Sequence, residues 1–379
     1  MKYCKGCLTT NLRPGAEFND GYCTPCQYAA SNGKVHATVK LSILKEKFRE
    51  SRSKQKNKGA YDCVVGVSGG KDSTRQAHWV RDRLGLRPLI VCCGYSPKQM
   101  SKIGAENLSN LITMGFDVVI ATPAPQTSAV LALQSFKQFG NVCKSTEMSL
   151  YSTVPRLAIE LGVNTLFWGE NNALQVGETR VEGLDEFDGN NIRKMNTLSS
   201  GGLGWITNAS EFPYLAEHYF YPTEIQFQKA KINIYFLGPV WDDWSQEDNA
   251  TYASLEGLTL RPGEELYTGD LTNASMLDEE FTNINMMLKY FKFGFGRATD
   301  YVDEKIRSGL ISRSEAITIV QKYDGICSDE IIARFSAYVG IQQAEFWAIA
   351  NQWVNKDLFT VYNSSRPKPK FEVGVDYEG

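Results

Sequence analysis

Residues 61–73 read YDCVVGVSGGKDS. The apolar run over 61–67 predicts a buried strand, and residues 72–84 predict a helix that ends at Gly85. Glycines between the two let backbone N–H groups approach an anion, and the helix N-terminus adds unpaired N–H donors and the positive end of its dipole. Because such a junction binds phosphate, this stretch predicts a phosphate-binding loop.

The side chains of the loop suit a nucleotide. Lys71 supplies a mobile positive charge, Asp72 carries a carboxylate that can hold Mg²⁺, and Ser68 and Ser73 offer hydroxyl donors. The loop differs from a Walker A motif, whose glycines lie further apart and whose Lys directly precedes Ser or Thr. The alternative is a glycine-rich strand–helix turn with no ligand.

Strand, SGGKDS and helix together resemble the PP-loop of ATP pyrophosphatases. The resemblance implies that ATP is cleaved between its α and β phosphates, that pyrophosphate is held in the loop, and that AMP passes to an oxygen of the substrate. It implies a PP-loop (HUP-like) fold, catalytic Lys71 and Asp72, ATP and Mg²⁺ as cofactors, and an ATP site formed by Ser68, Gly69, Gly70, Lys71, Asp72 and Ser73.

Length and charge narrow the class of protein. The chain has 379 residues, enough for two or three domains, with 40 Lys plus Arg against 43 Asp plus Glu. This balance favours neither nucleic acid nor an anionic membrane as partner. No apolar stretch approaches the roughly 20 residues of a membrane span, and no apolar segment of a signal peptide follows the first residues. We expect a cytoplasmic protein.

Four of the nine cysteines predict a structural zinc site. They form two C-x2-C pairs with 15 residues between them, a zinc-ribbon spacing, and four thiolates would close the coordination shell. The predicted ligands are Cys4, Cys7, Cys23 and Cys26. The other five have no such spacing: Cys63, Cys92, Cys93, Cys143 and Cys327. Of these, Cys63, Cys92 and Cys93 lie in expected strands and are predicted to belong to the core.

The pattern along the chain predicts four regions: a zinc ribbon over 1–30, a basic linker or helix over 31–60, a PP-loop ATP pyrophosphatase domain over 61–240, and a helical C-terminal region over 241–379. The third region alternates strands with helices, which predicts an α/β fold with a doubly wound parallel sheet.

The expected strands of the third region are 61–67, 88–93, 117–121, 164–168 and 232–237. Its expected helices are 72–84, 97–114 (capped by Ser96), 127–139 and 147–161 (capped by Ser145 or Thr146). The C-terminal helices are expected at 274–292, 299–308 (capped by Thr299), 312–323, 329–338 and 341–355.

Polar residues follow the expected strand 164–168, at the edge of the sheet where ligands bind. PP-loop proteins often carry a Gly-His-Asn-type motif here, and this chain has Gly169, Glu170 and Asn171. The resemblance implies Gly169 and Asn171 as ATP ligands. Glu170 departs from the motif by replacing its His, and a carboxylate there could act in catalysis by ligating Mg²⁺ or orienting the attacking nucleophile. A helix cap or loop turn is the alternative. Residues 169–210 beyond them predict a lid or a substrate-binding insertion.

Four further cations are candidates. Lys144, on a connection that can reach the ligand edge, would neutralise charge on the α phosphate, unless its segment only caps the next helix. Arginine binds carboxylate or phosphate in a bidentate manner, so Arg297, Arg307 and Arg313 are candidates for substrate or partner binding. Ion pairs on helix surfaces are the alternative for these arginines.

Several segments together resemble the N-acetyl sugar amidotransferases of bacterial surface-polysaccharide synthesis: the cysteine pairs, SGGKDS, WGEN at 168–171, and FGFGRATDYVDEKIRSGLISRSEA at 293–316. The resemblance implies conversion of an acetamido group on a UDP-linked sugar, such as a diacetamido uronic acid of lipopolysaccharide O-antigen, into an acetamidino group. The carbonyl oxygen would attack the α phosphate of ATP, and ammonia would then displace AMP. Lys2 stands where an N-terminal-nucleophile glutaminase needs Cys, which argues against such a glutaminase within this chain. The resemblance implies a separate glutaminase with a cyclase-like delivery subunit as the source of ammonia.

Two other readings remain. A PP-loop tRNA-modifying enzyme of the thiolation type would use the basic segment over 34–58, but it usually needs paired catalytic cysteines, and Cys143 and Cys327 are isolated. A zinc ribbon with a basic linker could also form a non-catalytic nucleic-acid or scaffold module, against which the intact SGGKDS argues.

Overall fold

The computed structural model describes residues 1–31, 37–54, 60–169, 189–194, 198, 203–206, 218–241, 244–263, 269–362 and 365–378. Its centre is a parallel five-stranded sheet in the order β5-β4-β3-β6-β7. The strands are β3 (Cys63–Gly66), β4 (Pro88–Cys93), β5 (Asp117–Ala121), β6 (Thr165–Trp168) and β7 (Asn233–Phe236). The expected α/β fold with a parallel sheet is confirmed, and each strand lies within one or two residues of its predicted range.

The strand order reverses direction between β3 and β6. From β3 the chain adds β4 and β5 on one side, then returns to add β6 and β7 on the other. In open parallel sheets ligands bind at such a switch point, beyond the carboxyl ends of the strands. SGGKDS follows β3 and Gly169 follows β6, so both candidate segments meet at this point.

Helices cover both faces of the sheet because its strand side chains alternate between two cores. Val65 and Phe167 face one core, which includes side chains of α2 (Ala37–Lys54), α3 (Lys71–Asp82) and α4 (Lys102–Thr113). Val64 and Leu166 face the other core, with α6 (Lys144–Glu160) and α10 (Glu224–Ala230). Within the predicted basic segment, α2 is a helix whose Leu44 and Phe48 are buried against the sheet.

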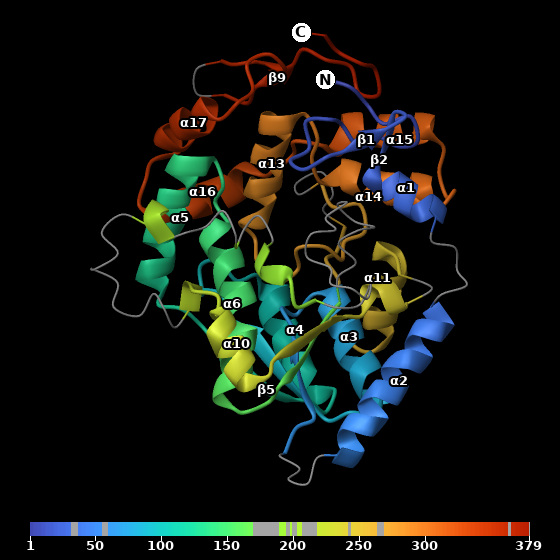
Figure 1. The fold of residues 1–379 in the computed structure, drawn as a ribbon. Helices are drawn as coiled ribbons and strands as arrows, with labels where there is room; N and C mark the ends of the chain where they lie inside the picture. Colours follow the sequence, from blue (N-terminus) through green and yellow to red (C-terminus); the bar gives the residue numbers. More distant parts are fainter. Residues whose placement is uncertain are drawn as a thin grey trace.

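The C-terminal region is mainly helical, as predicted. It contains α13 (Thr282–Phe293), α14 (Arg297–Arg307), α15 (Arg313–Tyr323), α16 (Asp329–Val339) and α17 (Gln343–Gln352), with a short pair of strands, β8 (Phe359–Thr360) and β9 (Lys368–Pro369). Their core also takes Phe136 of α5 (Pro125–Phe139) and Tyr3 and Leu8 from the N-terminus. In Figure 1 these helices lie above the sheet, and α11 (Gln246–Leu255) lies between α14 and α3.

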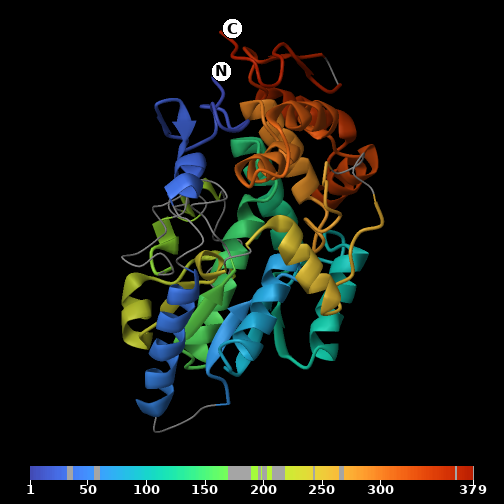
Figure 2. The ribbon, with the colours of Figure 1, turned by 90° about the vertical axis from the view of Figure 1, so that its right-hand side faces the viewer.

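The N-terminal cysteine segment packs beside the C-terminal helices. It contains the short strands β1 (Phe18–Asn19) and β2 (Tyr22–Cys23) and helix α1 (Thr24–Ser31). The two chain termini lie close together in both views (Figures 1 and 2), and Tyr377 N–H donates to the carbonyl oxygen of Met1 at 2.8 Å. Among the described residues, no helix combines the length and hydropathy that a membrane crossing requires.

Several predicted helix starts were wrong. α4 begins at Lys102 with Ser101 as its cap, whereas Ser96 belongs to the preceding turn. α6 begins at Lys144, before either predicted cap. α13 begins at Thr282, because the preceding residues run along the sheet domain, where Glu279 bridges to Met100. α14 begins at Arg297, so Thr299 lies inside the helix.

Candidate functional site

The phosphate loop closes on itself through one serine. Ser68 N–H donates to Ser73 Oγ at 3.3 Å, and the Ser73 hydroxyl donates to the carbonyl oxygen of Gly70 at 3.1 Å. Gly69 has φ +88°, in the left-handed region that glycine adopts without strain. The turn from β3 into α3 is therefore already shaped, with the first N–H groups of α3 facing the carboxyl edge of the sheet.

A cavity of about 120 Å³ lies at this edge, between the phosphate loop and β6. Polar groups of the loop form one side, and apolar side chains of α6 and the sheet form the other. A site with these two sides can hold phosphates next to a flat apolar ring. Its lining comprises Gly66, Val67, Ser68, Gly70, Asp72, Ser73, Gln76, Val91, Cys93, Leu150, Val154, Trp168 and Gly169.

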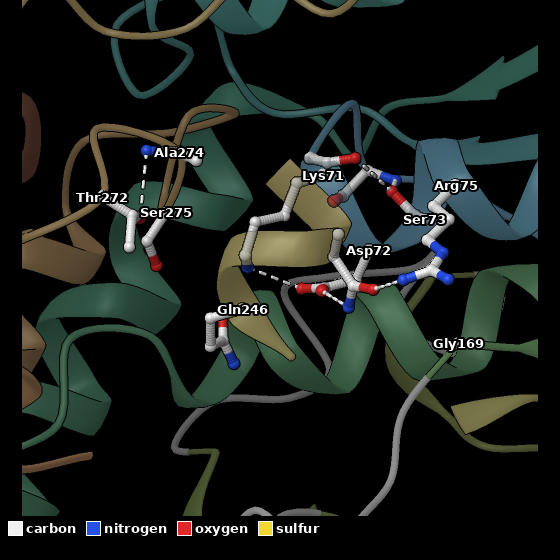
Figure 3. A network of polar contacts seen from close by, with 12 residues as sticks. Lys71, Asp72, Ser73, Arg75, Gly169, Gln246, Thr272, Ala274 and Ser275 are labelled. Atoms are coloured by element: carbon white, nitrogen blue, oxygen red, sulfur yellow. Dashed lines mark hydrogen bonds and ion pairs between the residues drawn. The ribbon is translucent and has the colours of Figure 1, made fainter. Parts of the chain in front are cut away.

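Lys71 and Asp72 form an ion pair with a separation of 2.8 Å between Nζ and Oδ2 (Figure 3). Lys71 is only 4% exposed, and its charge acts in a desolvated setting. Burial lowers the pKa of Lys71, but attraction to Asp72 and Tyr301 outweighs it, so its pKa ends above the usual value. The ammonium group is therefore charged at neutral pH.

Asn249 of α11 holds Asp72 and Arg75 together. Its Nδ2 donates to Asp72 Oδ1 at 2.6 Å, and its Oδ1 accepts from Arg75 Nη1 at 2.6 Å. Asn249 is fully buried, and the Arg75 guanidinium lies over the Trp241 ring at 4.6 Å. Asn249 could not be identified from the sequence, because this residue is 177 positions from Asp72 and belongs to no motif.

The C-terminal region also reaches the loop. Arg297, at the start of α14, contacts Ser275 and lies near the Tyr301 hydroxyl at 3.4 Å. Its positive charge is close enough to lower the pKa of Lys71. Arg297 therefore adds a second positive charge in the region of Lys71, an arrangement that suits a polyanion.

Asp278 adds a carboxylate to the same region. Its Oδ2 accepts from the Tyr95 hydroxyl at 2.7 Å. Burial raises the pKa of Asp278 above its usual range, although hydrogen bonds from Tyr95 and Ser68 and the charge of Lys71 act in the opposite direction. Asp278 thus links the phosphate loop to the segment before α13.

The other predicted site residues have different surroundings. Lys144 lies over the rings of Phe139 and Trp205, at 5.1 and 6.0 Å, and burial lowers its pKa. Gly169 lines the cavity, and its carbonyl oxygen accepts from Trp244 Nε1 at 3.2 Å. Glu170 and Asn171 lie outside the described residues, as does most of the predicted insertion over 169–210.

The three predicted arginines lie in three different parts of the fold. Arg297 lies close enough to Lys71 to lower the pKa of Lys71. Arg307 lies at the cysteine cluster, with Nη1 at 4.0 Å from Cys7 Sγ, and Arg313 donates to the carbonyl oxygen of Gly374 in the C-terminal tail at 3.3 Å. Of the three, Arg297 is the one that the fold brings to the phosphate loop.

The four predicted zinc ligands form one cluster, with all four sulfur atoms within 4.8 Å of one another. The Sγ atoms of Cys4 and Cys26 are 3.8 Å apart, and those of Cys7 and Cys23 are 3.6 Å apart. Zn–S bonds of about 2.3 Å in a tetrahedron require sulfur separations of about 3.8 Å, so the cluster fits zinc. Backbone N–H groups of Gly6 and Thr9 donate to Cys4 and Cys7 at 3.3 and 3.4 Å, as expected around metal-bound thiolates.

The C-terminal region is similar to a known protein family. Residues 272–371 match the family model described as LPS biosynthesis protein WbpG-like, C-terminal domain. No curated protein matches the chain. The match supports a lipopolysaccharide biosynthesis protein of the WbpG type, and its range includes Ser275, Asp278, Arg297 and Tyr301.

Proposed function

We propose that this protein is an ATP-dependent amidotransferase of lipopolysaccharide O-antigen synthesis. It adenylates the acetamido carbonyl of a UDP-linked N-acetylated sugar, with a diacetamido uronic acid as the leading candidate, and replaces the carbonyl oxygen with ammonia. The products are the acetamidino sugar, AMP and pyrophosphate. The proposal joins the biosynthetic role suggested by the matched domain to the chemistry that SGGKDS resembles.

One observation carries the proposal: Arg297 and Asp278, both in the matched domain, lie close to the loop, since Arg297 affects the pKa of Lys71, and Ser68 and Lys71 affect the pKa of Asp278. This supports a site shared between the matched domain and the loop SGGKDS. This juxtaposition is expected of an enzyme that activates a polysaccharide precursor with ATP, and it has no role in a non-catalytic scaffold.

The amide of the substrate is a poor electrophile, and its oxygen is a poor leaving group, so both must be activated before ammonia can react. An amide carbonyl resists attack by ammonia, so its oxygen first attacks the α phosphate, which forms an O-adenylyl imidate and releases pyrophosphate. Ammonia then adds to the imidate carbon, and AMP leaves with the original oxygen. Loss of a proton from nitrogen completes the amidine.

The chain's residues act mainly on the charge of the leaving pyrophosphate. Lys71, Arg297 and the N–H groups at the start of α3 are fixed donors in a partly desolvated site, where they stabilise developing negative charge strongly. Asp72 would hold Mg²⁺ together with phosphate oxygens, in keeping with the preference of this ion for one or two carboxylates. The ion would neutralise charge on the phosphates. Ammonia would come from a separate glutaminase with a cyclase-like delivery subunit.

The proposal is tested by mass spectrometry of a reaction with ATP, Mg²⁺, an ammonium salt and a UDP-diacetamido uronic acid. Replacement of oxygen by an NH group lowers the mass of the sugar by about one unit, and AMP and pyrophosphate should appear in equal amounts. A parallel reaction contains tRNA in place of the sugar. An unchanged sugar together with AMP formation that depends on tRNA would overturn the proposal in favour of the RNA-modifying alternative.

A further inference from the structure

Helix α14 contacts the cysteine cluster through Asp303. The Asp303 carboxylate accepts the N–H of Leu8 and the hydroxyl of Thr9, both at 2.6 Å. These two residues directly follow Cys7, and Thr9 N–H donates to Cys7 Sγ at 3.4 Å. Asp303 is 2% exposed, so the contact lies in the interior.

The next residue of α14, Glu304, contacts helix α11. Glu304 Oε1 accepts the N–H of Gln246, the first residue of α11, at 2.7 Å. An ion pair between Lys305 and Glu247 joins the same two helices. Adjacent residues on an α-helix point about 100° apart, which is why neighbours in sequence reach different elements.

Helix α11 in turn contacts the phosphate loop. It packs against α3, and its Asn249 donates to Asp72 Oδ1 at 2.6 Å. At the start of α14, Arg297 and Tyr301 influence Lys71 directly. α14 thus contacts the residues that follow Cys7 on one face, and on another it contacts α11, whose Asn249 holds Asp72.

We propose that α14 couples metal binding at the cysteine cluster to nucleotide binding at the phosphate loop, with Asp303 and Glu304 as positioning residues. Metal bound by Cys7 fixes the backbone at Leu8 and Thr9, which orients Asp303 and with it the helix. The helix in turn orients α11 through Glu304, and Asn249 holds the Asp72 carboxylate in place. Because coupling between two binding sites is reciprocal, bound nucleotide must also strengthen metal binding.

The inference rests on the proposed function only in its use of ATP as the ligand of the loop. The test measures how much zinc the full-length, zinc-loaded protein releases at equilibrium to a chromogenic chelator, with and without α,β-methylene-ATP and Mg²⁺. Calorimetry establishes that this analogue binds. The wild-type protein should bind zinc at least about fivefold more tightly when the analogue is bound.

Three variants separate the positioning role from simple loss of stability. Glu304→Ala should reduce the effect of the analogue on zinc release to within about twofold, whereas Glu304→Gln, which keeps an acceptor for Gln246 N–H, should retain it. Thr9→Val keeps all four cysteines and the shape of the side chain but loses the hydroxyl that donates to Asp303, so it should weaken the effect. Glu345→Gln, in an exposed ion pair with Lys137, is the matched control and should behave as the wild type.

The outcomes distinguish the two proposals. If calorimetry shows binding of the analogue but zinc release from the wild type is unchanged, the coupling is overturned and the proposed function stands. An equal gain in zinc affinity in the wild type, Glu304→Ala and Thr9→Val would overturn the path through α14. Absence of any nucleotide binding would overturn the proposed function and this inference together.

Discussion

Lys71 and Asp72 are neighbours in the sequence, yet their partners come from distant parts of the chain. Besides the ion pair between them, Asp72 accepts from Asn249 of α11, and Arg297 and Tyr301 of α14 affect the pKa of Lys71. The motif predicts that these two residues bind phosphate and metal. Their partners could not be predicted, because hydrogen bonds across a fold leave no local pattern in the sequence.

Lys71→Ala should abolish pyrophosphate release, with a loss of at least about a hundredfold in rate, because a preorganised cation at the leaving group is removed. Pyrophosphate formation in a coupled assay measures this rate, and zinc content should stay unchanged. Lys229→Ala, an exposed lysine on α10, is the control and should keep full activity. Retained activity in Lys71→Ala would refute the assignment of the site.

Asn249→Ala should raise the KM for ATP about tenfold, because the Asp72 carboxylate loses a donor and the Arg75 guanidinium loses an acceptor. Steady-state kinetics with varied ATP at saturating Mg²⁺ measures the effect. Asn110→Ala, whose amide donates to the carbonyl oxygen of Gly257 at an exposed position, should leave KM unchanged. Equal KM values in both variants would remove Asn249 from the site.

At the scale of elements, the N-terminus of α14 is capped by a residue from another part of the chain. Asp324 accepts from the N–H groups of Gly296 and Ala298, both at 2.7 Å, and from the Thr299 hydroxyl at 2.5 Å. The sequence predicts Thr299 as the cap, because an N-cap is usually a Ser, Thr, Asp or Asn directly before the helix. That prediction is wrong, since the carboxylate that satisfies these donors follows α15.

Asp324→Ala should lower the free energy of unfolding by about 3 kcal/mol, because it leaves several buried N–H groups unpaired. Urea denaturation followed by circular dichroism measures this value. Gly296→Ala should also destabilise the protein, since a Cβ there would lie 2.7 Å from Asp324 Oδ1. Asp329→Ala, whose carboxylate is largely exposed, should change stability by less than about 1 kcal/mol and serves as control.

Glu304 should make stability depend on pH. Burial raises the pKa of Glu304 from 4.5 to about 7, against the opposing influence of Gln246 N–H, Arg307 and Lys71. Below pH 4.5 the carboxyl is protonated in both the folded and the unfolded protein. As pH rises from 4.5 to 7 the folded protein binds more protons than the unfolded one, so the free energy of unfolding falls through this window and then levels off.

Glu304→Gln removes this contribution. The free energy of unfolding of the variant, relative to that of the wild type, should therefore increase between pH 4.5 and pH 7, by up to about 3 kcal/mol. Urea denaturation at a series of pH values measures this difference. A difference that stays constant across the window would contradict the raised pKa.

At the scale of the whole molecule, the two ends of the chain form one unit. Tyr3 N–H donates to Asp376 Oδ1 at 2.8 Å, and Arg13 forms an ion pair with Asp300 of α14. The N-terminal module therefore belongs in space with the helices at the other end of the sequence (Figure 2). A loss of the metal should affect this whole unit.

Cys23→Ser should lose the bound metal, about one zinc ion per chain in the wild type, because a four-thiolate site depends on every ligand. Elemental analysis measures the zinc, and the melting temperature should fall at the same time. Cys327→Ala, a buried cysteine outside the cluster, should keep its zinc. Equal zinc content in both variants would contradict the predicted ligand set.

The sequence by itself determined the features that depend on neighbours in the chain. Apolar runs separated by amphipathic segments specify a parallel sheet, the glycines of SGGKDS specify the loop, and the two C-x2-C pairs specify the cysteine cluster. In each case the physical cause, whether burial, φ freedom or ligand spacing, acts over a few residues, so it is visible as a local pattern.

The tertiary structure alone decided which distant groups meet. It brought Asn249 to Asp72, Arg297 to Lys71, Asp324 to the start of α14 and Arg307 to the cysteine cluster. A buried charge or unpaired N–H must find a partner, but any suitable group that the packing brings near can satisfy it. The partner is therefore selected by how the sheet, α11 and α14 pack together, and this packing is a property of the whole chain.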